Sequence, residues 1–155
     1  MNSKSKYLHI SNDDILVSLK EPENEYVLHF DGCSKGNPGF SGAGAVLYEN
    51  GREIYAGCAF VGENETNNVA EYTGLIIGLK KAREMGIPRL EVKGDSLLVI
   101  KQMKGEYKVK SPGLFALYQQ AKSLEIHFEW VGYTHVFRDQ NKRADALSNE
   151  GLNAI

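Results

Sequence analysis

The chain has 155 residues, the length of one ordinary domain, and its composition is globular, with 42% hydrophobic and 25% charged residues, 16 Gly and 4 Pro. A formal charge of −2 excludes a strongly basic polyanion-binding protein, and no apolar run reaches the roughly 20 residues of a membrane span. The first residues lack the apolar core of a signal peptide and are too acidic for a transit peptide. We therefore expect a cytoplasmic protein with no membrane partner, in which Cys33 and Cys58 are free thiols.

The first half of the chain predicts three strands joined as an antiparallel meander. Residues 26–30 alternate, with apolar side chains on one face. Residues 32–39 are rich in Gly and predict a loop. A second strand over 41–48 is built largely from small residues that allow close packing, and the Asn-Gly turn at 50–51 leads into a returning strand over 53–60.

The rest of the chain predicts helices and two more strands. In chain order these are a helix over 68–85, a strand over 89–92, a helix ending at 103, a helix over 113–122, a strand over 126–130 and a closing helix over 142–152, with a loop over 132–141. This order is typical of an α/β domain over residues 26–152, a five-stranded mixed sheet flanked by helices. Residues 1–25 are expected to form an N-terminal extension of extra strands or a flexible arm.

Four acidic residues occupy the ends or starts of these elements. Asp31 ends the first strand, Glu71 lies in the first turn of a helix, Asp95 directly follows the fourth strand, and Asp145 lies near the start of the last helix. Such positions converge at one edge of an open sheet, where four carboxylates would repel one another and raise one another's pKa values. Hard divalent cations relieve that repulsion, and two ions ~3.5–4 Å apart suit phosphodiester cleavage.

Each acid also has a purely structural interpretation, which its position alone leaves open. Asp31 before a glycine is compatible with a simple turn. Asn68 three residues before Glu71 matches a capping box, and Asp95 suits a helix N-cap, as does the serine after it. Asp145 near a helix start is favoured by the helix dipole.

The sequence around the four acids resembles the four motifs of the type 1 ribonucleases H. In chain order the matching segments are Asp31-Gly32-x-x-x-Gly36-Asn37-Pro38-Gly39 with Gly42 and Gly44, then Thr66-Asn67-Asn68-x-Ala70-Glu71-Tyr72, then Gly94-Asp95-Ser96, and then His135-x-x-x-x-x-Asn141-x-x-Ala144-Asp145-x-Leu147. All four occur in order within residues 26–152. The resemblance implies a ribonuclease H fold and a metal-dependent endoribonuclease that cleaves the RNA strand of RNA–DNA hybrids, leaving 5′-phosphate and 3′-hydroxyl ends.

The resemblance also implies roles for individual residues. It makes Asp31, Glu71, Asp95 and Asp145 the ligands of two Mg²⁺ ions, with Mn²⁺ as an alternative ion. It makes His135 an aid to proton transfer or product release, against the alternative of a surface histidine packed on its neighbour. It also implies contacts with the hybrid, whose wide minor groove exposes 2′-hydroxyls. The residues implied to make them are Gly32, Gly36, Asn37, Thr66, Asn67 and Asn68.

The chain departs from the family in lacking the basic, Trp-bearing protrusion that several bacterial members carry before their last strand. Four lysines at 101, 104, 108 and 110 are either a phosphate-facing surface or a solvated one. We therefore expect weak, salt-sensitive hybrid binding. Tyr107 and Phe137 are expected to pack rather than stack on nucleic acid, and Ile126, Phe128 and Trp130 are expected in the core.

Two rival functions stay open at this point. One is a nuclease of the same fold that acts on structured DNA, and the other is a non-catalytic nucleic-acid-binding module that kept the fold. The presence of all four carboxylates favours an enzyme over a binding module. Nothing in the sequence implies a protein partner, and a monomer is the default expectation.

Overall fold

The computed structural model describes residues 24–154 and, as backbone, the short strands 5–9 and 16–20. The elements in chain order are β1 (Ser5–His9), β2 (Leu16–Lys20), β3 (Tyr26–Lys35), β4 (Gly39–Glu49), β5 (Arg52–Glu65), α1 (Asn67–Glu84), β6 (Arg89–Gly94), α2 (Leu97–Met103), α3 (Pro112–Glu125), β7 (Trp130–His135), the 3₁₀ turn η1 (Arg138–Gln140) and α4 (Lys142–Leu152). Within these described ranges, no helix combines the length and the apolar character that crossing a membrane requires.

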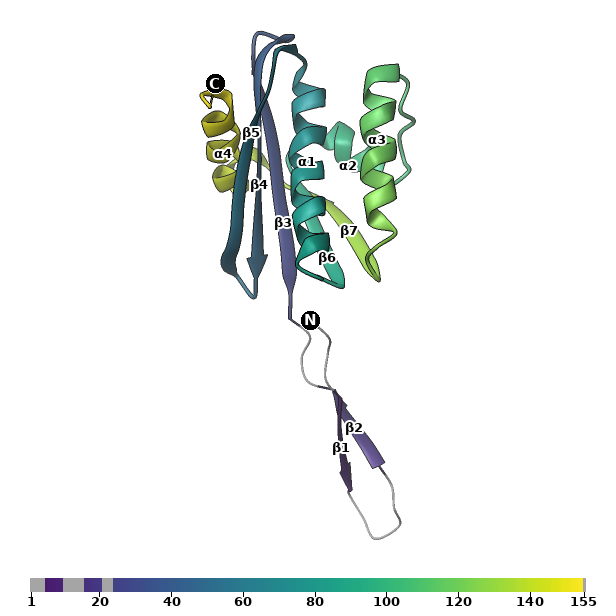
Figure 1. The fold of residues 1–155 in the computed structure, drawn as a ribbon. Coiled ribbons are helices and arrows are strands. Elements are labelled where there is room, and N and C mark those ends of the chain that lie inside the picture. Colours follow the sequence, from purple (N-terminus) through teal and green to yellow (C-terminus); the bar gives the residue numbers. More distant parts are fainter. Residues whose placement is uncertain (1–4, 10–15, 21–23, 155) are drawn as a thin grey trace.

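A five-stranded mixed sheet forms the centre of the fold, in the order β5-β4-β3-β6-β7 (Figure 1). The strands β3, β4 and β5 pair antiparallel, whereas β6 is parallel to β3 and β7 is parallel to β6. The strands β1 and β2 form a separate antiparallel pair. The predicted α/β class, with its meander and two further strands, is confirmed. The division into an extension over 1–25 and a catalytic domain over 26–152 stays a prediction.

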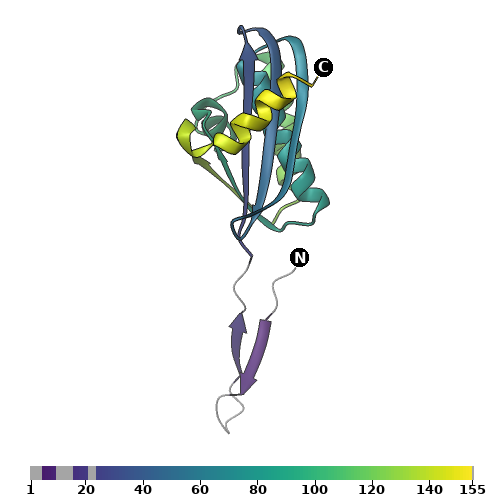
Figure 2. The same cartoon turned by 90° about the vertical axis from the view of Figure 1, so that its left-hand side faces the viewer.

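The helices pack on both faces of the sheet. On one face, alternate residues of β3 such as Leu28 and Phe30 are buried against α1, in a core that α2 and α3 extend. On the other face, α4 crosses the meander and buries Leu147 against Val46 of β4 (Figure 2). The sheet therefore lies between α1 and α4, which carry Glu71 and Asp145 respectively.

Two glycines let the sheet approach both helices very closely. A Cβ on Gly32 of β3 would lie 2.2 Å from the backbone carbonyl carbon of Ala70 in α1. A Cβ on Gly42 of β4 would lie 2.2 Å from the backbone oxygen of Ser148 in α4. Because these contacts are with backbone, no side chain fits at either position without moving a helix.

The predicted loop after the first strand is wrong. β3 continues to Lys35 and pairs with β4 along its whole length, as far as the pair Lys35 with Phe40. The glycine-rich segment is a strand because its small residues fit between the two helices, and only the short turn at Gly36, with φ +80°, leaves the ladder. Asp31 therefore lies inside a strand and not at its end.

The predicted strand over 126–130 is also wrong, as is the loop assigned to 132–135. The helix α3 extends to Glu125, and the backbone N–H groups of His127 and Phe128 then bond back to its last carbonyls. The apolar alternation thus spans a turn before β7 begins at Trp130. As a result only Phe128 joins the core, whereas Trp130 is exposed and Ile126 is 78% exposed.

Candidate active site

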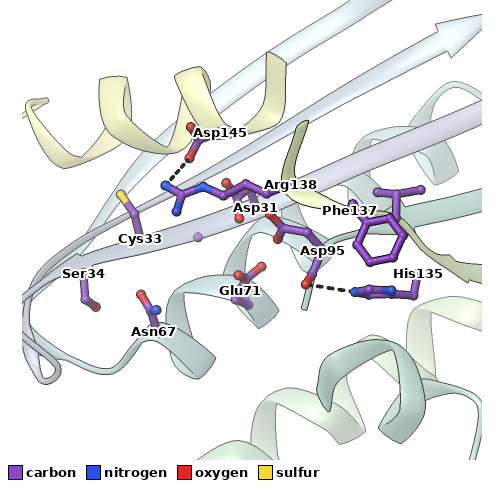
Figure 3. Close-up of a pocket in the computed structure, with 12 residues that line it drawn as sticks. Asp31, Cys33, Ser34, Asn67, Glu71, Asp95, His135, Phe137, Arg138 and Asp145 are labelled. Atoms are coloured by element: carbon purple, nitrogen blue, oxygen red, sulfur yellow. Dashed lines mark hydrogen bonds and ion pairs between the residues drawn. The ribbon is translucent and has the colours of Figure 1, made fainter. Parts of the chain in front are cut away.

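The four predicted acids line one pocket of about 490 Å³, where β6 ends beside the middle of β3 (Figure 3). Asp31 comes from β3, Glu71 from α1, Asp95 from the residue after β6, and Asp145 from the first turn of α4. Three of them converge most closely, since one carboxylate oxygen each from Asp31, Glu71 and Asp95 lie within 4.8 Å of one another. Asp145 approaches Asp31 from the other face of the sheet.

The structural interpretations fail for three of the acids. Thr66 is the N-cap of α1 and accepts a hydrogen bond from the backbone N of Val69 at 3.2 Å, so the predicted capping box does not form. Glu71 lies beyond the first turn of α1, contrary to prediction. Ser96, and not Asp95, caps α2.

Asp31 is only 4% exposed within a strand, which rules out the turn interpretation for that acid. Asp145 does lie in the first turn of α4, where the helix dipole favours it.

Burial raises the pKa values of two of these carboxyl groups in the metal-free protein. Desolvation raises the pKa of Asp31 to about 8, with further contributions from the nearby Asp95 and Asp145 carboxylates. Burial, followed by the charges of Asp31 and Asp95, raises the pKa of Glu71 well above its ordinary value. Glu71 is 8% exposed, and its Oε1 has no hydrogen-bond partner among the described residues. An unsatisfied buried oxygen beside two other carboxylates is the donor set that a hard divalent cation takes.

A buried amide ties α4 to β3 beside the acids. Asn141 donates a hydrogen bond from Nδ2 to the backbone oxygen of Phe30 at 3.0 Å, next to Asp31 in sequence. Its Oδ1 accepts a hydrogen bond from Nδ1 of His29 at 3.1 Å. The backbone oxygen of Asn141 in turn accepts from the backbone N of Asp145. This link holds Asp145 at the pocket, a role of Asn141 that the sequence did not indicate.

His135 also lies in the pocket, but at the end of β7 and not in a loop. Its Nε2 is 3.3 Å from the backbone oxygen of Asp95. Its ring meets that of Phe137 edge to face, with the centroids 5.7 Å apart. The hydroxyl of Tyr133, the neighbour on which His135 was alternatively expected to pack, instead donates to Glu125.

The proposed hybrid-binding residues lie partly inside this pocket. Gly32 and Asn67 line it, whereas Gly36, Asn37, Thr66 and Asn68 do not. The Oδ1 of Asn37 accepts a hydrogen bond from the backbone N of Asn67 at 3.0 Å. The turn between β3 and β4 is thereby joined to the start of α1.

Among the pocket-lining residues that sequence reasoning did not assign to the site are Arg138 and Phe137. Arg138 follows β7 and places a guanidinium nitrogen 3.9 Å from Oδ1 of Asp145, and its position between two motif residues was the available signal. Phe137 is 72% exposed, so the packing expected of it is wrong. The same expectation is wrong for Tyr107, whose ring is half exposed beneath Lys101. In both cases the aromatic residue lies on a connecting segment, outside the core-facing side of any helix or strand.

Three comparisons place this fold and site among known proteins. A model of the reverse transcriptase-like family matches residues 29–151. A ribonuclease HI of Halobacterium salinarum is 41% identical over 139 residues, covering 88% of this chain and 70% of the relative. A bifunctional protein of Mycobacterium tuberculosis, Rv2228c, is 42% identical over 130 residues, covering 83% of this chain but 35% of the relative. The chain thus spans about a third of that mycobacterial relative's length.

A solved structure agrees with the sequence relatives. The ribonuclease H1 named LC11, which comes from compost and was solved in complex with an RNA/DNA hybrid, is 35% identical, with a TM-score of 0.78 over 83% of this chain and 97% of that one. The fold and the matching family define a ribonuclease H-like domain. This chain belongs to the type 1 ribonuclease H family.

Proposed function

We propose that this chain is a metal-dependent endoribonuclease that hydrolyses the RNA strand of RNA–DNA hybrids without marked sequence preference. The observation that carries the proposal is the convergence of three carboxylates within 4.8 Å, one of them with a buried, unpartnered oxygen. A binding module needs no such cluster, because it gains nothing from the cost of burying the carboxylates. Relatives named ribonuclease H support the same activity.

In this proposal Asp31, Glu71, Asp95 and Asp145 hold two Mg²⁺ ions, with Mn²⁺ as an alternative. The bound ions supply activation of the attacking water and stabilisation of the leaving 3′ oxygen, which gives 5′-phosphate and 3′-hydroxyl ends. The protein's own contribution is to hold four oxygen donors at one pocket, on the strand β3, on the helices α1 and α4 and on the residue that follows β6. Because burial raises the pKa values of Asp31 and Glu71 in the metal-free protein, we expect cation binding to be accompanied by proton release.

The proposed substrate contacts surround the carboxylates. We assign hybrid binding to the following residues: Gly32, Gly36, Asn37, Thr66, Asn67 and Asn68. The hydrogen bond between Asn37 and Asn67 holds the turn after β3 next to the start of α1, so that their polar groups lie close together. Amide and hydroxyl groups on such a surface suit the 2′-hydroxyls and sugars of an RNA minor groove. The similar LC11 ribonuclease H1 forms a complex with an RNA/DNA hybrid, which supports this substrate.

His135 is proposed to assist proton transfer or product release. Its ring lies at the pocket, next to the backbone of Asp95, so it can reach a water or a departing oxygen there. No carboxylate pairs with His135 among the described ion pairs, so its ring nitrogens are not committed to a structural salt bridge.

Part of the lysine cluster is already engaged within the protein. Glu106 pairs with Lys101 at 2.9 Å and with Lys104 at 3.4 Å. Lys108 and Lys110 form no ion pair with another described residue. We propose that these two lysines make most of the phosphate contacts that the cluster provides, and that hybrid binding is therefore weak and steeply salt-dependent.

We also propose a location, an oligomeric state and a domain division for the enzyme. Cys33 and Cys58 are both free thiols, which suits the reducing cytoplasm. We propose a monomer that works without a protein partner, with residues 26–152 as the catalytic domain and 1–25 as an extension. Sedimentation of the full chain at micromolar concentration tests the oligomeric state.

Cleavage of three matched duplexes tests the activity. An RNA–DNA hybrid, an RNA duplex and a DNA duplex of one sequence are incubated with the protein in Mg²⁺. The proposal predicts cleavage of the hybrid with little or no cleavage of the DNA duplex. Cleavage of the DNA duplex in preference to the hybrid would instead favour the alternative nuclease, and binding without any cleavage would favour the non-catalytic module.

A further inference from the structure

Phe137 is a large apolar side chain in a polar pocket. It is 72% exposed, and it is the one exposed large apolar residue among the described residues that line the acidic pocket. Burying a phenylalanine side chain ordinarily contributes stabilising free energy, because it removes apolar surface from water. The free protein does not gain this energy at residue 137, which leaves it available to a ligand that covers the ring.

Hydrogen bonds hold the backbone around Phe137 at a defined place beside the carboxylates. The backbone N of Val136 donates to the oxygen of Gly94 at 2.9 Å, which fixes the chain beside the residue before Asp95. The backbone oxygen of Phe137 accepts from the backbone N of Gln140 at 2.9 Å, at the start of η1. Figure 3 shows the ring next to His135, on the side of the pocket where Asp95 lies.

We propose that Phe137 is a substrate-contacting residue that packs its ring on a ribose of the RNA strand next to the cleaved phosphate, an inference that rests on the proposed function. The faces of the bases are stacked inside a duplex, so the surface that meets the pocket consists of ribose C–H groups, 2′-hydroxyls, phosphates and base edges. The carboxylates and amides of the pocket match the polar groups of that surface. Phe137 offers the apolar face that matches the ribose carbons.

This contact contributes to binding more than to the chemical step. The ring has no group that donates, accepts or transfers a proton, so its loss removes affinity from the ground state and the transition state alike. Substitution of Phe137 should therefore raise KM and Kd together while kcat changes little. An indirect effect through the neighbouring His135 would instead lower kcat.

The test compares Phe137→Ala with Phe137→Trp and with the matched control Phe115→Ala. Phe115 is another exposed phenylalanine, on α3, where it stacks on Tyr118 outside the pocket lining. For each variant, hybrid Kd is measured by fluorescence anisotropy in EDTA, and KM and kcat are measured in Mg²⁺. We expect Phe137→Ala to raise Kd and KM about tenfold, as for other aromatic contacts with nucleic acid, with kcat within about threefold of wild type. Phe137→Trp and Phe115→Ala should stay within about twofold.

The same substitution in a His135→Ala background separates a direct contact from an indirect one. The proposal predicts that Phe137→Ala still weakens binding about tenfold there. An unchanged Kd and KM, or a loss confined to kcat that vanishes in the His135→Ala background, would overturn it. Failure of the proposed function would give a different result, because wild type itself would then not cleave the hybrid.

Discussion

Asp31→Asn probes the energetic cost of the acidic cluster, because it keeps the side chain's shape and removes its charge. In the metal-free protein, burial and the neighbouring carboxylates raise the pKa of Asp31 from 3.8 to about 8. The unfolded chain therefore releases this proton above about pH 4, whereas the folded protein retains it until near pH 8. Stability is lost across that window as pH rises, by up to about 4 kcal/mol at pH 7 at ~1.36 kcal/mol per pH unit.

The expected result is a gain of stability in Asp31→Asn that depends on pH. In urea unfolding with EDTA, the variant should be more stable than wild type at pH 7, by at most about 4 kcal/mol, and the two should be nearly equal near pH 4. Glu84→Gln, at the exposed end of α1 far along the helix from Glu71, is the control and should stay within about 0.5 kcal/mol of wild type at both pH values.

The same variant should lose metal response and activity. Added Mg²⁺ should stabilise Asp31→Asn less than wild type, because ligand stabilisation follows the affinity of the site. Turnover should fall by at least ~10³-fold, since a metal centre supplies several kcal/mol of transition-state stabilisation. An Asn variant that keeps full activity, or that is no more stable than wild type at pH 7 in EDTA, would refute the reasoning.

Three further perturbations follow from the same geometry. His135→Ala should lower turnover about 10²-fold while Mg²⁺ stabilises the variant as much as wild type. A loss of turnover as large as that of Asp31→Asn would give the histidine a more central role, and unchanged turnover would show that it has no role in catalysis. Replacing Lys108 and Lys110 with Ala should flatten the log–log salt dependence of hybrid Kd by roughly 1–2, more than replacing the two lysines that Glu106 engages, and an unchanged slope would place the phosphate contacts elsewhere. Gly42→Ala should cost roughly 1–3 kcal/mol in urea unfolding and also lower turnover, because its Cβ would displace α4; wild-type stability would show that α4 tolerates the shift.

Local chemistry was enough to predict much of the architecture and the position of two acids. Asp95 directly after a strand and Asp145 in the first turn of a helix are both found where the pattern put them. Their convergence followed from the rule that strand ends and helix starts meet at one edge of a sheet. The environment of Asp31 was not predictable in this way, because the strand around it continues only by pairing with β4 and by fitting Gly32 against α1.

The other features that the sequence did not predict also depend on tertiary structure. The alternation of apolar residues before Trp130 has the period of a strand, and only the extra turn of α3 reveals that it is not one. The exposed Phe137 and the pairing of Arg138 with Asp145 arise where β7 gives way to η1, a segment with no periodicity to interpret. Asn141 was visible only as a motif residue, since its buried hydrogen bonds join parts of the chain more than a hundred residues apart.

One measurement tests the central claim most directly, namely cleavage of a single hybrid whose RNA and DNA strands carry different labels. In Mg²⁺, wild type should cut the RNA strand at internal positions, leave the DNA strand intact and produce 5′-phosphate and 3′-hydroxyl ends. Activity should be absent in EDTA and reduced at least ~10³-fold in Asp31→Asn. Cleavage of the DNA strand, or RNA cleavage that persists in EDTA, would contradict a metal-dependent ribonuclease H.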